Sequence, residues 1–122
     1  MTRKMIPVAG MFGLMLALWP LLGSAHTHLE SSEPAKNAVL TSPPSSVRLV
    51  FSSRIEAEYS KIEVTDAEGK RVNEEKASGS ENHRELISAL DKDLKPGTYQ
   101  VKWNVISGDG HRVKGEYTFT VQ

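Results

Sequence analysis

The sequence predicts an all-β fold, an antiparallel β-sandwich or small barrel with Greek-key connections. Three observations support this prediction. Apolar residues recur with a period of two from Leu29 onward, turn residues follow about every ten positions, and no helical stripe of useful length occurs. About six or seven short strands in such a chain are typical of this architecture. Because cysteine is absent, the hydrophobic core must stabilise the fold without disulfides.

The strands of the first half can be placed from their alternation. Residues 29–32 should begin the first strand, and residues 47–51 alternate after the breaker Pro43-Pro44. Residues 61–65 alternate again and predict a further strand. Between these two strands, residues 54–61 predict a turn or a single helical coil.

The second half continues the same pattern. Residues 67–70 predict a turn, a short strand is expected around Val72, and the polar residues 74–82 predict an exposed loop. Residues 85–90 should form another strand. The two clearest strand patterns come last, after the turn Pro96-Gly97. They are residues 99–105, which place Trp103 on the core face, and residues 117–121.

The amino-terminal segment has the features of a secretory signal. Arg3 and Lys4 precede the mostly apolar residues 6–22, and small residues follow at the cleavage position, Gly23-Ser24-Ala25. We therefore predict a signal peptide at residues 1–25 and a single domain at residues 26–122. The alternative is an uncleaved membrane anchor, which prolines and glycines within a barely sufficient apolar run disfavour.

Composition restricts what the mature chain can bind. Cleavage would leave 97 residues with 13 basic and 15 acidic side chains, a net charge of −2 and no basic run, so nucleic acid is not an expected partner. All four methionines lie in the predicted signal, so the mature chain has no sulfur ligand. We expect it to be soluble outside the cytoplasm, with no stable membrane insertion after cleavage.

Asp109 and His111 form the first candidate metal-binding pair. Separated by one residue, their side chains can lean to the same side of an extended or loosely turning chain and approach one ion. However, Asp109-Gly110 between two alternating strands is also a common hairpin signal, in which case His111 is an ordinary loop residue. Spacing alone leaves both interpretations open.

His26 adds a second argument for a metal. Cleavage after Ala25 would give His26 a free amine beside its imidazole, so that it could chelate one ion through two nitrogens. The imidazole of His111 and a carboxylate oxygen of Asp109 would complete a set of three nitrogens and one oxygen, which suits tetragonal Cu(II). The sequence predicts one Cu(II) per mature chain.

Other metal-binding modes remain as alternatives. Zinc accepts histidine and carboxylate but prefers tetrahedral geometry, and Cu(I) prefers sulfur, which the mature chain lacks. A local mode could wrap Cu(II) or Ni(II) in His26-Thr27-His28 through the amine, backbone amides and the second imidazole, if the terminus is loose. Otherwise His28 supports the site from its edge or faces solvent. His83 is expected to be a solvated surface residue.

Catalytic motifs are missing, so the chain is not expected to be an enzyme. It contains no serine elbow, no phosphate-binding glycine loop and no HExxH. Two alternatives to a copper carrier stay open. One is a copper-dependent oxidative enzyme, since a terminal histidine with a second imidazole resembles the copper brace of polysaccharide-cleaving enzymes. The other is a metal-free structural β domain.

Three stretches resemble one known family. The mature start HTHLESSEPA, the strand ending in Phe51-Ser52, and PGTYQVKWNVISGDGHRVKGEYTFTV are similar to the CopC family of copper-binding proteins, especially its small, methionine-poor YobA-type members. The resemblance spans nearly all of residues 26–122. It implies an immunoglobulin-like or cupredoxin-like fold and a periplasmic Cu(II) carrier or buffer for copper resistance, homeostasis or delivery.

The resemblance also implies particular residues and partners. The Cu(II) ligands would be His26, Asp109 and His111, and copper could pass to a separate membrane transporter of the CopD type. Two departures from the family pattern stand out. The methionine-rich loop of members with a Cu(I) site is missing, so His83 is no evidence for a second site. Many relatives also have an acidic residue near the metal where this chain has Ser53.

Overall fold

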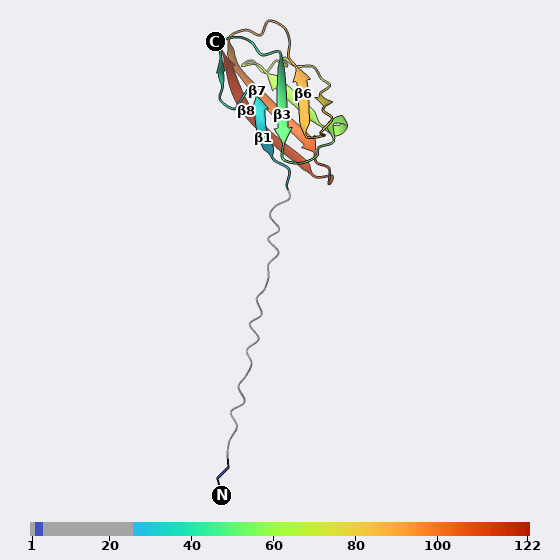
Figure 1. The fold of residues 1–122 in the computed structure, drawn as a ribbon. Helices are drawn as coiled ribbons and strands as arrows, with labels where there is room; N and C mark the ends of the chain where they lie inside the picture. Colours follow the sequence, from blue (N-terminus) through green and yellow to red (C-terminus); the bar gives the residue numbers. More distant parts are fainter. Residues whose placement is uncertain (1, 4–25) are drawn as a thin grey trace.

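Two β-sheets packed face to face make up the domain (Figure 1). The computed structural model describes residues 2–3 and 26–122, so the predicted signal peptide lies almost wholly outside the described residues. The first sheet has the order β1 (Leu29–Glu33), β3 (Ser46–Phe51), β6 (Glu85–Ala89) and β5 (Ser78–Gly79). The second has the order β2 (Val39–Leu40), β8 (Arg112–Val121), β7 (Gly97–Ile106) and β4 (Lys61–Thr65).

The predicted all-β class is confirmed, and of the two predicted architectures the structure has the sandwich. The two sheets remain separate and do not close into a barrel. A 3-10 helix, η1 (Ala57–Tyr59), lies where the sequence predicted a turn or a single helical coil. Within residues 2–3 and 26–122, no helix has the length and apolar character needed to cross a membrane.

Three details of the strand prediction are corrected. The strand expected around Val72 is reduced to two isolated bridges, Thr65↔Arg71 and Asn73↔Leu90. The polar loop of residues 74–82 contains the short strand β5, which pairs with β6. β2 pairs in parallel with β8, so the sheets are not wholly antiparallel.

Alternating side chains from both sheets form one core. Tyr99 of β7 and Phe119 of β8 are register partners, and their rings stack with centroids 5.3 Å apart. Burial of each large apolar side chain contributes about 1.5–3 kcal/mol. The fully enclosed apolar members are Val47, Leu49, Phe51, Val64, Leu86, Val101, Val105 and Phe119. The charged residues of β7 and β8 all lie at even-numbered positions, on the face away from the core, as the period of two predicts.

Trp103 packs against this core, as the sequence predicted, and it needs a glycine opposite. Its register partner on β8 is Gly115. A Cβ atom at Gly115 would lie only 2.6 Å from Cε2 and 2.7 Å from Cη2 of the indole. The ring also lies against Tyr117, with centroids 6.1 Å apart. The missing side chain of Gly115 therefore makes the space that the indole occupies.

Replacing Gly115 with alanine should lower the free energy of unfolding by about 1–3 kcal/mol, because the added methyl group overlaps the indole ring. Denaturant unfolding followed by tryptophan fluorescence measures this change. The matched control is Lys114→Ala on the adjacent exposed position, which should stay within about 0.5 kcal/mol of the parent. Equal stability of the two variants would contradict the proposed packing.

Candidate metal centre

The turn between β7 and β8 carries two of the three predicted ligands. The amide of Gly110 donates to the carbonyl of Ser107 at 2.9 Å, and the amide of Ser107 donates to the carbonyl of His111 at 2.8 Å. Gly110 has φ +88°, a conformation that glycine adopts without steric cost. A hairpin turn at Asp109-Gly110 is therefore confirmed, and this tight turn also holds Asp109 close to His111.

The carboxylate of Asp109 is held by three hydrogen bonds within this turn. The hydroxyl of Ser107 donates to Oδ1, and the amide of His111 donates to the same oxygen at 3.1 Å. Nδ1 of His111 lies 2.9 Å from Oδ2. The Ser107 hydroxyl first, then the ring and amide of His111, hold the pKa of Asp109 well below its usual range. Asp109 is thus an ionised carboxylate oriented towards an imidazole.

The amino-terminal end of the domain docks on the residues that follow β3. The amide of Ser52 donates to the carbonyl of His28 at 2.8 Å, and the amide of His28 donates to Oγ of Ser52 at 2.9 Å. The hydroxyls of Thr27 and Ser53 are hydrogen-bonded to each other. Thr27 is only 4% exposed. The start of the domain is therefore fixed in place rather than loose.

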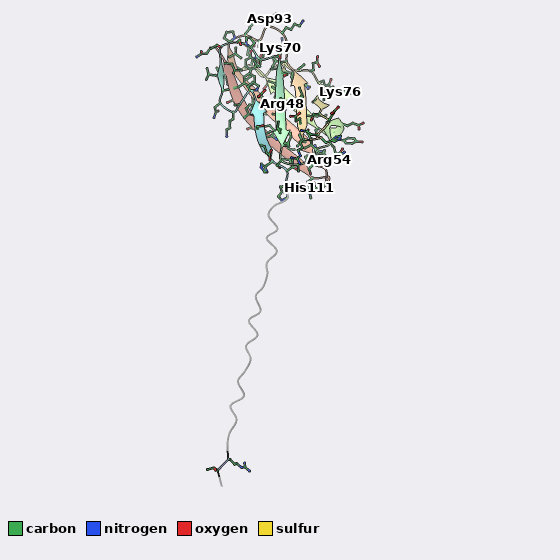
Figure 2. The ribbon with its side chains drawn as sticks, in the orientation of Figure 1. Arg48, Arg54, Lys70, Lys76, Asp93 and His111 are labelled. Carbon is green, nitrogen blue, oxygen red and sulfur yellow. The ribbon has the colours of Figure 1, made fainter. Side chains whose placement is uncertain are left out.

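The same residues, 52–55, also hold the turn, and we refer to them as the bridging segment. The amide of Gly108 donates to the carbonyl of Arg54 at 2.8 Å, and Ile55 pairs with Ser107 in an isolated bridge. Figure 2 shows Arg54 and His111 at one end of the sandwich, far from Lys70 and Asp93 at the other end. The bridging segment thus brings the start of the domain to the β7–β8 turn.

His26 and His111 meet at this end of the molecule. Their ring centroids are 6.1 Å apart and the planes lie at 78°, an edge-to-face arrangement. His111 is hydrogen-bonded to Asp109, so all three predicted ligands lie in one neighbourhood. The side chains of His111 and Asp109 are 68% and 52% exposed, and His26 is exposed as well. The group is open to solvent.

The three side chains do not yet form a complete binding group. Among residues 2–3 and 26–122, no three His, Asp or Glu side chains are assembled closely enough to hold a metal ion. The hydrogen bond between Asp109 and His111 brings two of the three side chains together. In the full chain Ala25 precedes His26, so the nitrogen of His26 is a peptide nitrogen and the predicted terminal amine does not exist.

The two other histidines do not join this group. His28 is exposed, and its main chain is paired with Ser52. His83 is also exposed, as expected, and adopts φ +57° in the turn before β6. Its carbonyl accepts a hydrogen bond from the amide of Ile55 at 2.7 Å. His83 therefore supports the bridging segment through its backbone.

Sequence reasoning missed the hydroxyl groups that support the site. Ser107 is hydrogen-bonded to the predicted ligand Asp109. Ser52, Ser53 and Thr27 instead fix the residues that follow His26, and none of the four belongs to a metal-binding pattern. Ser53 was noticed only as the residue in place of an acid. In the structure, the hydroxyl of Ser53 is hydrogen-bonded to that of Thr27, the neighbour of His26. This position therefore fixes the backbone beside the candidate site without adding a negative charge.

Comparisons with known proteins place this chain in a family. The family described as the CopC domain matches residues 29–122. Protein YobA of Escherichia coli strain K12 is 40% identical over 99 residues, which are 80% of each chain. Copper resistance protein C of Xanthomonas campestris pv. juglandis is 34% identical over 104 residues, covering 80% of this chain and 81% of that protein.

A solved structure supports the same assignment. The crystal structure of CopC from Methylosinus trichosporium OB3b superposes with a TM-score of 0.74 at 38% sequence identity, and it covers 80% of this chain and 94% of that one. The resemblance noticed in the sequence is thereby confirmed. With the fold and the relatives in agreement, the chain belongs to the CopC family, and its role is related to copper.

Proposed function

We propose that the processed protein is a periplasmic carrier or buffer that holds one Cu(II) ion through His26, Asp109 and His111. The observation that carries this proposal is the edge-to-face contact of the rings of His26 and His111, which lie far apart in the sequence. Cleavage of residues 1–25 as a signal peptide would supply the amine of His26. Together with Asp109, these groups give three nitrogens and one oxygen.

This set of donors favours Cu(II) over the alternative ions. Imidazole, amine and carboxylate suit tetragonal Cu(II), whereas zinc prefers a tetrahedral site and generally binds less tightly to matched ligands. Cu(I) prefers thiolate or thioether, and residues 26–122 contain neither cysteine nor methionine. Asp109 adds a negative charge that stabilises the doubly charged ion.

We favour a carrier over an oxidative enzyme because of Asp109 and the exposure of the group. An ionised carboxylate beside His111 would fill a coordination position that oxygen chemistry requires to be free. Exposed ligands suit exchange of the ion with another protein. In this proposal copper is cargo, used for resistance or homeostasis or passed to a separate membrane transporter of the CopD type.

Removing either ligand of the turn should change the bound copper. The variants Asp109→Ala and His111→Ala should alter the electron paramagnetic resonance spectrum and lower Cu(II) affinity at least about tenfold, since even the partners of metal ligands typically account for about 10–100-fold. Competition with a chelator measures the affinity. His83→Ala is the control and should leave both readouts unchanged. Parent-like spectra in both ligand variants would reject this site.

The amine of His26 can be tested without altering any side chain. One alanine added before His26 in the processed protein turns the amine into an amide, so Cu(II) affinity should fall at least about tenfold. A matched alanine added after Gln122 should have no effect. Mass spectrometry of the exported protein checks that the parent starts at His26. Full affinity after the amino-terminal addition would exclude the terminal chelate.

The hydroxyl of Ser107 should control the acidity of Asp109 in the metal-free protein. Because folding lowers the pKa of Asp109, its contribution to stability is complete above about pH 3.9, the ordinary value, and is lost as the pH falls through the folded-state pKa. Ser107→Ala should raise this pKa towards the ordinary value, whereas Ser107→Thr keeps the hydroxyl and should preserve it. Carboxyl-detected NMR titration measures both. An unchanged pKa in Ser107→Ala would contradict the assigned hydrogen bond.

A further inference from the structure

The amino terminus of the processed chain offers two competing modes of copper binding. The hydrogen bonds in the structure oppose one of them. The proposed site joins His26 to the β7–β8 turn. The local mode would instead use the amine of His26, the amide nitrogens of Thr27 and His28, and the imidazole of His28. Each amide nitrogen must lose its proton to solvent before it can bind the ion, and it can then donate no hydrogen bond.

One of the nitrogens that the local mode needs is already engaged. The amide of His28 donates to Oγ of Ser52 at 2.9 Å, while the carbonyl of His28 accepts from the amide of Ser52 at 2.8 Å. His28 is thus held on both sides of its main chain by a single residue of the bridging segment. To use this nitrogen, copper would have to break the hydrogen bond to Ser52.

The residue between the two histidines is fixed as well. Thr27 is only 4% exposed, and its hydroxyl is bonded to that of Ser53. The local mode folds the first three residues of the processed chain around a single ion. This folding would withdraw Thr27 from its buried place and separate it from Ser53. The two serines therefore oppose the local mode at successive residues.

We infer that Ser52 and Ser53 select the copper-binding mode of the amino terminus, keeping His28 out of the coordination sphere and directing His26 towards His111. The inference rests on the proposed function and adds its specificity-determining residues. Neither serine contacts the ion. Both act by holding the backbone of Thr27 and His28 in the position at which the rings of His26 and His111 meet. This role also accounts for a serine at a position where an acid would have supplied charge.

The test compares ligand dependence in two backgrounds of the processed, full-length domain. In the parent, His111→Ala should change the electron paramagnetic resonance spectrum of the Cu(II) protein, and His28→Ala should not. In the double variant Ser52→Ala/Ser53→Ala, this dependence should reverse. Its d–d absorption should also move to shorter wavelength, because amide nitrogens are strong-field ligands.

Two further variants serve as controls for this comparison. Ser52→Thr retains a hydroxyl and should preserve the dependence of the parent on His111. Thr98→Ala removes a hydroxyl from the opposite end of β7, where it lies 3.3 Å from that of Thr120, and should also behave as the parent. Circular dichroism checks that each variant is folded. The same dependence on His111 in the double variant as in the parent would overturn the inference alone. A parent spectrum insensitive to both Asp109→Ala and His111→Ala would overturn the proposed function itself.

Discussion

The arrangement of this end of the molecule depends on the bridging segment, residues 52–55. It continues from β3 in one sheet and contacts the β7–β8 turn of the other through Arg54 and Ile55. On its other side it binds the first residues of the domain through Ser52 and Ser53. The segment thereby holds the residue after His26 and a turn about eighty residues later at the same end of the molecule.

The core determines where the bridging segment lies. Phe51 ends β3 fully buried, and Ile55 is 2% exposed, so both ends of the segment are anchored in apolar surroundings. The residues between them are polar and partly exposed, and their hydroxyls are available for hydrogen bonds. The rigid strands thereby support polar residues at the end of the sandwich, and these residues help to hold the exposed candidate ligands in position. Under the proposed function, such a division suits an ion that must be bound specifically and still be exchanged.

The fold was largely predictable because a period of two survives wherever one face of a strand is buried. β3, β4 and β7 were predicted within a few residues of their ends. β2 and the bridges near Val72 were missed or misjudged, since two paired residues carry no period. The pair Asp109 and His111 was visible from spacing, and His26 from the cleavage position. Ser52, Ser53 and Ser107 were not, because their partners depend on register and turn geometry, which single residue types do not encode.

In the metal-free protein, the hydrogen bond between Asp109 and His111 fixes the two side chains relative to each other. It orients both groups and orders the turn, so fewer conformations remain to be lost when an ion binds. The nitrogen of His26 is a peptide nitrogen until the preceding residue is removed. Under the proposed function, the complete set of donors therefore exists only after processing, which confines tight Cu(II) binding at this site to the exported form. Ser52 and Ser53 would then act at the moment when the new amine first becomes able to chelate.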